Sequence, residues 1–176
     1  MLTIVGLGPS DISHTSHEAF EAIKRAERLL LRTAIHTEAM DLVSQGISFE
    51  SFDALYDNAT DFESLYHSIA IEVANIANTS DVVYAVPGHP MVAEETVRIL
   101  LPILKDRAIP YRIISSMSFL EPTLACLEIS INQGIQIHDA LEINSLRANP
   151  NSGLLIYQIY DKDVAAGVKL QLLNVY

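Results

Sequence analysis

The chain has 176 residues, of which 49% are hydrophobic and 19% charged, a balance that supports a packed core and excludes a disordered chain. Its formal charge of −11, without a Lys/Arg cluster, argues against nucleic acid as a partner. No apolar run reaches the roughly 18 to 20 residues of a membrane helix. A strand begins near the first residue without a basic leader, so we expect no membrane partner, no signal peptide and a cytoplasmic location.

Cysteine and histidine usage argues against two kinds of site. The single cysteine, Cys126, excludes an internal disulfide and fits a reducing compartment. It lies in an apolar helical pattern, which predicts an inert core thiol and not a nucleophile. The histidines are scattered without the spacing of zinc ligands, so the sequence predicts no metal site.

The first two thirds of the chain alternate between strand and helix patterns. Strands are expected at 3–7, 29–31, 47–52, 82–86 and 111–114. Between them, a helix is expected at 16–28, where Thr15 and Glu18 have capping-box spacing, and another at 37–44, which Gly46 ends in a left-handed conformation. A long helix capped by Asp61 follows, and a further one around 97–104, where Pro102 should kink or split the helix. This rhythm over residues 1–114 predicts an α/β domain with a parallel sheet.

The rhythm changes after residue 114. A helix is expected at 118–127, short strands at 135–137 and 154–159, and a last helix capped by Asp161. We interpret residues 115–176 as a second, smaller α/β domain. It looks truncated, because it offers few strands from which to build a sheet.

The central strand pattern, Val82-Val83-Tyr84-Ala85-Val86, is apolar at every position, as expected for a strand buried on both faces. It ends in Pro87-Gly88-His89-Pro90. Ligands of open α/β sheets bind at the carboxyl ends of the strands. Glycine lets a ligand approach the backbone, and the prolines hold the loop rigid. His89 is a hydrogen-bond donor, a general base or an ordinary turn residue.

Two further turns follow strands. Gly6-Leu7-Gly8-Pro9-Ser10-Asp11 lacks the third glycine of a dinucleotide-binding turn, and Pro9 delays the helix, which leaves a ligand loop or an ordinary turn. Ser115-Ser116-Met117-Ser118-Phe119 offers hydroxyl groups that either cap the next helix or hold the polar edge of a ligand. The chain has no Walker loop and no nucleophile elbow.

In this order the three turns resemble those of the tetrapyrrole methylase superfamily. More closely, the chain resembles the amino-terminal, methylase-like domain of bacterial proteins that carry a MazG-type nucleotide pyrophosphohydrolase. The segments that strengthen this resemblance are Leu31-Arg32-Thr33, 49–53, 159–161 and 168–170. The set of acidic Glu-x-x-Glu pairs that binds magnesium in the pyrophosphohydrolase is missing, since Glu18-Ala19-Phe20-Glu21 is a single such pair.

The resemblance implies a protein of two α/β domains that binds S-adenosylmethionine in the cleft between them, usually as a homodimer. It also implies a MazG-type pyrophosphohydrolase as a further partner. The positions that match the cofactor-binding motifs are Pro9, Pro87, Gly88, His89, Val92, Ser118, Phe119 and Gln158. Two positions depart from the family. His89 replaces an aspartate that could attract the cofactor's positive charge, and Ser115-Ser116 replaces Pro-Gly.

The family implies methyl transfer by direct displacement, in which the protein mainly aligns the reactants. A general base is needed only for an acceptor that must lose a proton, and His89 or Tyr84 could serve. We therefore expect an S-adenosylmethionine-dependent methyltransferase with an unidentified acceptor. The alternative is a non-catalytic ligand-binding or dimerisation module associated with the pyrophosphohydrolase. A nucleotide-binding α/β domain of another kind is the third interpretation.

Overall fold

The computed structural model of the chain describes residues 1–56 and 61–175, without the side chains of Gln133 and Val175. It divides into two compact units, residues 1–123 and residues 124–176, and each is described by itself. The domain boundary expected after residue 114 falls earlier than this division, because Ser115 and Ser116 are hydrogen-bonded to Gly6 and Ser16 of the first unit.

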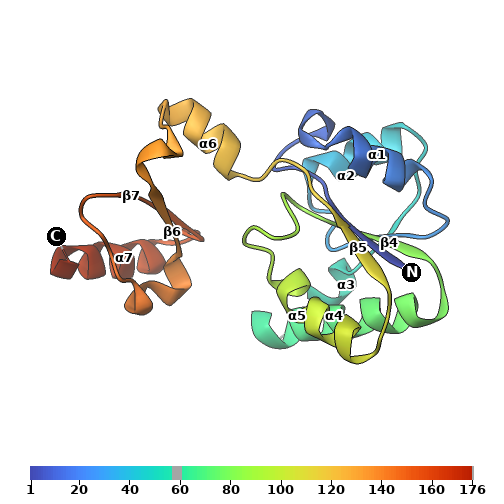
Figure 1. The fold of residues 1–176 in the computed structure, drawn as a ribbon. Helices are drawn as coiled ribbons and strands as arrows, with labels where there is room; N and C mark the ends of the chain where they lie inside the picture. The colour runs from blue at the N-terminus through green and yellow to red at the C-terminus, as the bar shows by residue number, and fades with distance from the viewer. Residues whose placement is uncertain (57–60, 176) are drawn as a thin grey trace. The chain divides into compact units, whose positions relative to one another are not determined.

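The first unit is built on a five-stranded sheet in the order β3-β2-β4-β1-β5 (Figure 1). Its strands are β1 (Leu2–Gly6), β2 (Leu29–Leu31), β3 (Glu50–Ser51), β4 (Val82–Val86) and β5 (Tyr111–Ile114). Every pairing is parallel, as predicted. All five residues of β4 are buried, which confirms that this strand is covered on both faces. The strand expected at 47–52 is only a two-residue edge strand, since only Glu50 and Ser51 pair with β2.

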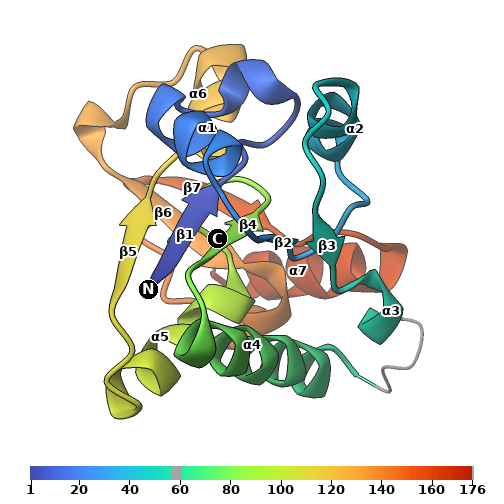
Figure 2. The same ribbon diagram turned by 90° about the vertical axis from the view of Figure 1, so that its right-hand side faces the viewer.

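Helices cover both faces of the sheet (Figures 1 and 2). On one face lie α1 (His17–Lys24) and α2 (Thr37–Ser44). On the other lie α4 (Phe62–Thr79) and α5 (Glu95–Asp106), with the short α3 (Asp53–Tyr56) beside them. The first core contains Val5, Leu7, Ala19, Ile23 and Leu42, and the second Leu2, Ile4, Ile69, Val73 and Leu100. Alternate residues of β1 thus enter opposite cores, as the pleat of a strand requires.

Local signals explain where the helices begin and end. Asp61 caps α4 by accepting from the Ser64 amide, as predicted. The cap of α1 is Ser16, which accepts from the Ala19 amide, and not the expected Thr15. Gly46, just after α2, has the left-handed φ of 73° that was expected there. Pro102 does not split α5, because it lies on the exposed side, where water can bind the carbonyl that it leaves unpaired.

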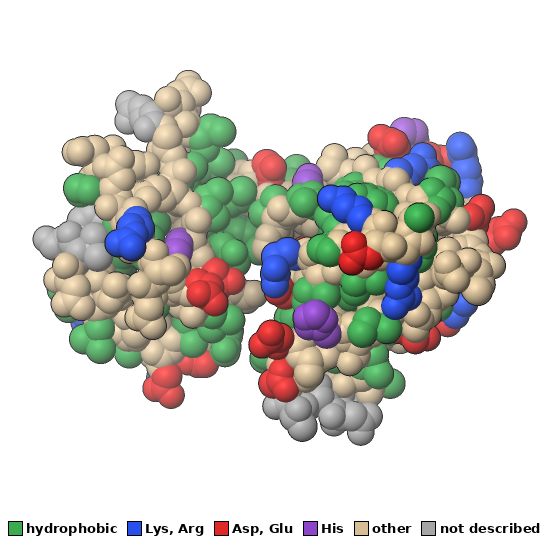
Figure 3. All heavy atoms as spheres, turned by 60° about the horizontal axis from the view of Figure 1, so that its bottom comes forward, with side chains coloured by type: hydrophobic (Ala, Val, Ile, Leu, Met, Phe, Trp, Pro, Cys, Tyr) green, Lys and Arg blue, Asp and Glu red, His purple; other side chains and the backbone are tan. Residues whose placement is uncertain are grey.

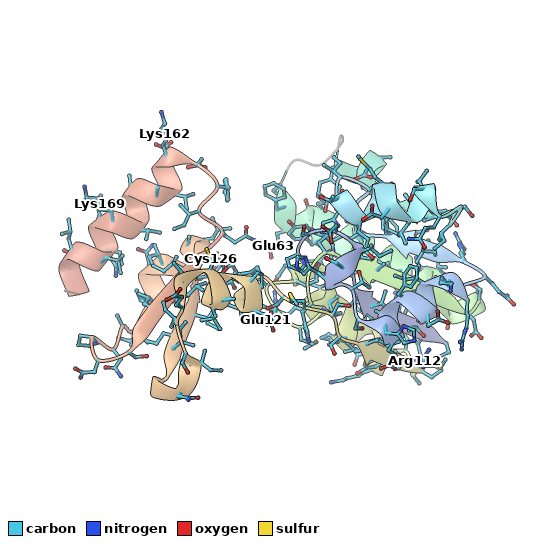
Figure 4. The ribbon with its side chains drawn as sticks, turned by 90° about the horizontal axis from the view of Figure 1, so that it is seen from above. Glu63, Arg112, Glu121, Cys126, Lys162 and Lys169 are labelled. Atoms are coloured by element: carbon cyan, nitrogen blue, oxygen red, sulfur yellow. The ribbon has the colours of Figure 1, made fainter. Side chains whose placement is uncertain are left out.

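The second unit contains a two-stranded parallel sheet of β6 (Ile135–Asp139) and β7 (Gly153–Tyr157). Its core joins η3 (Ala140–Ser145) to α7 (Lys162–Val175), the helix that carries Lys162 and Lys169 in Figure 4. The structure also has two short 3₁₀ helices, η1 (Ile12–His14) in the first unit and η2 (Ile131–Gln133) in the second.

The helix α6 (Leu120–Leu127) crosses the division between the units and carries Cys126 (Figure 4). The expectation that Cys126 is a core thiol is wrong, because its side chain is exposed. The apolar pattern misled because Leu127 and Ile129, which would form such a core with it, are also exposed.

Positive and negative side chains are mixed on one face of the first unit. On the face of the first unit shown in Figure 3, Lys and Arg side chains lie among Asp and Glu side chains and do not gather in a patch. Among the described residues, no helix combines the length and the apolar character needed to cross a bilayer.

Candidate functional site

The connections that follow β1 and β4 lead to opposite faces of the sheet. These strands are neighbours in the sheet, but the chain continues from β1 to α1 on one face and from β4 to α5 on the other. Loops that diverge from adjacent parallel strands leave the position where ligands of open α/β sheets bind. The loops in question are 7–15 and 87–94, which carry two of the motifs.

Gly8 and Gly88 join these two loops. The Gly8 amide donates to the Gly88 carbonyl (3.1 Å), and the Gly88 amide donates to the Gly8 carbonyl (2.7 Å). Both residues have left-handed φ angles, 82° and 68°, which glycine adopts without strain. A side-chain Cβ at Gly8 would come within 2.7 Å of His14, whereas one at Gly88 would meet no atom within 4 Å. Gly88 therefore presents its backbone to open space, where a ligand can approach.

A third loop, residues 115–119, meets the other two at Gly6. A Cβ at Gly6 would lie 2.4 Å from the carbonyl oxygen of Gly88, 2.9 Å from Pro90 and 3.1 Å from the Ser116 amide. Such distances leave no room for any side chain at position 6. The loops that follow β1, β4 and β5 are therefore packed around one residue, and the three motifs form a single structure.

Ser116 connects the third loop to the first strand and the first helix. Its hydroxyl donates to the Gly6 carbonyl (2.6 Å) and accepts from the Ser16 amide (2.9 Å). Ser16 returns the contact by donating its hydroxyl to the Ser115 carbonyl (2.6 Å). Ser116 is 6% exposed. The departure from Pro-Gly at these positions thus places a structural hydroxyl in the protein, and Ser116 does not offer its side chain to a ligand.

His89 is half-buried and its ring is held by the loop itself. Its Nδ1 accepts from the Met91 amide (3.0 Å), so Nδ1 carries no proton and the neutral ring keeps its proton on Nε2. Glu121, at the start of α6 (Figure 4), is close enough for its charge to interact with His89. Burial alone would raise the pKa of Glu121, but hydrogen bonds from Ser118 outweigh it and lower the pKa. Glu121 is therefore a carboxylate beside the loop that lacks the family's aspartate.

Ser118 and Phe119 lie at the end of the third loop. The Ser118 hydroxyl is 1% exposed, donates to Glu121 (2.6 Å) and accepts from the Leu120 amide (3.0 Å). This is capping, one of the two interpretations of the serine-rich turn. The Phe119 carbonyl accepts from the Thr123 hydroxyl (2.7 Å). Ser118 and Phe119 therefore lie directly before α6 and are bonded to its first turn.

The structure brings most of the sequence-predicted site residues together. Seven of them lie on the three loops at the carboxyl end of the sheet: Pro9, Pro87, Gly88, His89, Val92, Ser118 and Phe119. Gln158 belongs to the second unit, directly after β7 and with a left-handed φ of 65°. Their contact with a cofactor stays a prediction.

Tyr84 is excluded as a general base. It is 0% exposed, and its hydroxyl lies 3.0 Å from that of Thr96, which donates to Glu94. Burial and the nearby Glu94 carboxylate raise the pKa of Tyr84 well above its usual value. A tyrosine that is fully buried and held in the hydrogen-bond chain from Tyr84 through Thr96 to Glu94 cannot reach a methyl acceptor.

Sequence reasoning missed the ion pair between Arg32 and Glu94, at the other end of this hydrogen-bond chain. Arg32 Nε lies 3.4 Å from Glu94 Oε2, and the Glu94 side chain is only 4% exposed. Burial raises the pKa of Glu94 although Arg32 and Thr96 oppose the shift. Arg32 directly follows β2 and Glu94 caps α5, so they meet only because β2 pairs with β4. No local pattern connects positions so far apart.

A cavity of about 530 Å³ lies at the opposite end of the sheet from the three loops. Its walls come from α1 and from the amino ends of β1, β4 and β5, including Thr3, Val82 and Arg112. Two of its charged groups, Arg25 and Glu21, pair across 3.0 Å. We place the candidate site at the loops, because ligands of such sheets bind at the carboxyl ends of the strands.

The described residues also determine what the loops can hold. No group of three or more His, Cys, Asp or Glu side chains in residues 1–56 and 61–175 is arranged to bind a metal ion. The loops instead offer a close approach to the Cα of Gly88, the imidazole of His89 and the Glu121 carboxylate. Such a set suits an organic ligand, and the carboxylate favours a cationic one.

A doubly wound parallel sheet with three interlocked loops at its switch point defines the chain as an open α/β protein. Its particular family is shown by the sequence profile of the tetrapyrrole (corrin/porphyrin) methylases, which matches residues 1–173. The chain belongs to this family.

A curated protein is similar to nearly the whole chain. The uncharacterized protein YabN of Bacillus subtilis is 33% identical over 173 residues, which are 98% of this chain. The chain spans about a third of that relative's length, 35%.

Two solved structures show the same fold. Uroporphyrin-III-C-methyltransferase from Thermus thermophilus has a TM-score of 0.69 at 16% identity, over 98% of this chain and 71% of its own. Uroporphyrin-III C-methyltransferase from the same organism, complexed with S-adenyl homocysteine, has a TM-score of 0.53 at 17% identity, over 79% of this chain and 55% of its own.

Proposed function

We propose that the chain binds S-adenosylmethionine at the loops 7–15, 87–94 and 115–119 and transfers its methyl group to an acceptor. The observation that carries the proposal is the convergence of these loops on Gly6, in a chain that belongs to the tetrapyrrole methylase family. A relative of the same fold holds S-adenyl homocysteine, the demethylated product of this cofactor.

The first unit suits the cofactor chemically. Gly88 leaves its backbone open, so a flat or polar ligand edge can lie against the loop. The Glu121 carboxylate stands beside His89 and supplies negative charge near a loop that has lost its usual aspartate. A sulfonium ion is attracted by this carboxylate, whereas its demethylated product is not.

The remaining chemistry needs little from acid and base groups. S-Adenosylmethionine supplies an activated methyl group, and the protein's residues bind, orient and exclude water. Pro9, Pro87, Val92 and Phe119, which all lie on the three loops, would bound the cofactor. Ser118 would act through the backbone of its turn, because its hydroxyl is already engaged.

A non-catalytic binding module is the second candidate. One observation favours it: the hydroxyls of Ser16, Ser116 and Ser118 are all engaged within the protein, and the ring of His89 is held at Nδ1. Of these four side chains, only His89 keeps an atom, Nε2, that could move a proton. The family resemblance alone supports the homodimer, the MazG-type partner and the larger second domain. The cytoplasmic location rests on the resemblance and on the unpaired Cys126.

The experiment compares two glycine variants by calorimetric titration with S-adenosylmethionine and S-adenosylhomocysteine. Gly88→Trp places an indole in the open space at the loop and should abolish binding. Gly46→Trp is the matched control, because Gly46 also has a left-handed φ and no atom within 4 Å of its Cβ position, but follows α2. Equal binding loss in both variants, or no binding by the unaltered chain at millimolar ligand, contradicts the proposal. Binding without methyl transfer to any cell-extract acceptor selects the binding module.

A further inference from the structure

Glu38 is a buried carboxyl group behind the loop 7–15. It lies in the first turn of α2, beside that loop on the same face of the sheet (Figures 1 and 2). Its side chain is 0% exposed. Oε1 lies 2.6 Å from the Thr15 hydroxyl, and Oε2 is buried without a hydrogen-bond partner among the described residues. None of the ion pairs in residues 1–56 and 61–175 includes Glu38.

Thr15 makes two contacts that a single hydrogen atom cannot serve. Its hydroxyl lies 2.7 Å from the Leu7 carbonyl and 2.6 Å from Glu38. A carbonyl and an ionised carboxylate can only accept, while a hydroxyl has one hydrogen to donate. Both contacts are hydrogen bonds only when Glu38 is protonated. Glu38 then donates to Thr15, and Thr15 donates to Leu7.

The surrounding groups also favour the protonated form. Asp11 of the loop and Asp41 of α2 are carboxylates close enough to oppose a further negative charge. His36 caps α2 and accepts from the Glu38 amide through Nδ1 (3.4 Å), while burial and the nearby Arg32 lower its pKa, so it supplies no cation. His14 of η1 has its own Nδ1 buried and unpartnered among the described residues.

Burial is the largest cause that raises the pKa of Glu38, to about 7, against the opposing hydrogen bond of Thr15. The raised pKa of Glu38 and the single hydrogen atom of the Thr15 hydroxyl both favour a protonated Glu38. The first follows from burial and the second from hydrogen-bond geometry. Glu38 changes its charge close to neutral pH.

The hydrogen-bond chain from Glu38 through Thr15 to Leu7 closes the loop 7–15, which carries Pro9. Leu7 and Thr15 are its two ends, and Thr15 joins them through the Leu7 carbonyl. When Glu38 loses its proton, either Thr15 turns to the carboxylate and releases Leu7, or a buried charge stays without a donor. Each alternative destabilises the observed loop.

We propose that Glu38 is a positioning residue whose proton holds the loop 7–15 in its ligand-binding form, so that a rise in pH through neutrality weakens binding of the S-adenosyl ligand. This inference rests on the proposed function for the identity of the ligand. The effect of the Glu38 proton on the loop 7–15 does not require a ligand and can be tested in the ligand-free protein.

The first test needs no ligand. In ¹³C- and ¹⁵N-labelled full chain, the Glu38 carboxyl signal, identified by its absence in Glu38→Gln, should titrate near pH 7, and the amide signals of residues 7–15 should move with the same midpoint. Glu38→Gln keeps a donor toward Thr15 at every pH and should remove this movement. Glu18→Gln, an exposed carboxyl in the first turn of α1, is the control and should keep it. Titration of Glu38 below about pH 5, near its unperturbed range, or the same loop movement in Glu38→Gln, overturns the proposal.

The second test measures S-adenosylhomocysteine binding at about pH 6 and about pH 8.5. The Kd of the unaltered chain should rise about tenfold, as expected when binding shifts one pKa by about one unit. In Glu38→Gln it should change less than about twofold, within ordinary scatter. An equal rise in both chains overturns the coupling. If no variant binds at either pH, the proposed function fails, and the ligand-free titration still decides the role of Glu38. If Glu38→Gln does not fold, Thr15→Val removes the same hydrogen-bond chain and should abolish the loop movement.

Discussion

The Cα of Gly6 and the carbonyl oxygen of Gly88 are so close that any side chain at position 6 would come within 2.4 Å of that oxygen. Gly6 ends β1 and Gly88 lies beyond the end of β4, so this contact unites two loops that the chain sequence separates by most of the first unit. The glycine at position 6 is required by space and not by backbone angle.

Gly6→Ala should therefore destabilise the first unit by about 1 to 3 kcal/mol, the usual cost of overpacking. The control is Gly46→Ala, whose φ of 73° costs about 1 kcal/mol but whose Cβ meets no atom. Urea unfolding followed by circular dichroism measures both. A Gly6→Ala chain that is as stable as the unaltered one would show that the loops do not pack as described.

Ser116→Ala should destabilise the protein by about 2 kcal/mol, because it leaves the Gly6 carbonyl and the Ser16 amide without their shared partner. Ser115→Ala removes an exposed hydroxyl from the neighbouring residue and should change the unfolding free energy by less than about 0.5 kcal/mol. Thermal unfolding of the two variants compares them directly. Equal effects would mean that the Ser116 hydroxyl is not structural.

Arg32→Met should cost about 3 kcal/mol at neutral pH, since it leaves the Glu94 charge buried without its partner. Adding Glu94→Gln should recover much of this loss, because the second change removes the uncompensated charge. Urea unfolding at pH values above and below the titration of Glu94 checks the cause. Burial raises the pKa of Glu94, so the Arg32→Met chain should regain stability as the pH falls and Glu94 takes up a proton. A loss that is independent of pH would contradict this explanation.

Glu38 makes stability depend on pH with a definite sign. Its pKa is about 7 in the folded chain, above the usual 4.5, so the folded state holds a proton that the unfolded chain releases. Stability should fall as the pH rises from about 4.5 to 7, by up to about 3 kcal/mol. Glu38→Gln should lack this fall and be the more stable chain at pH 8. Chemical unfolding at several pH values measures the difference. Parallel curves for the two chains would refute the prediction.

Much of the fold is written in local patterns. The valine-rich run 82–86 predicted a strand buried on both faces, and the structure confirms it, because a parallel strand between two helical layers has no polar side to show. Asp61 predicted the start of α4 for an equally local reason, since a cap contacts only the first turn of its own helix. Cys126 and Tyr84 were misjudged, because exposure depends on what other segments cover.

The sequence by itself determined the alternation of strands and helices, the three motif loops and the resemblance that led to the family, because each depends on neighbouring residues. Only the tertiary structure decided that these loops meet at Gly6, that Ser116 belongs to the framework, and that Arg32 reaches Glu94. It also placed Glu38 of α2 against Thr15, which the sequence had assigned to a helix cap. These contacts depend on the strand order β3-β2-β4-β1-β5 and on the face that each helix covers, and no periodicity within one element encodes either.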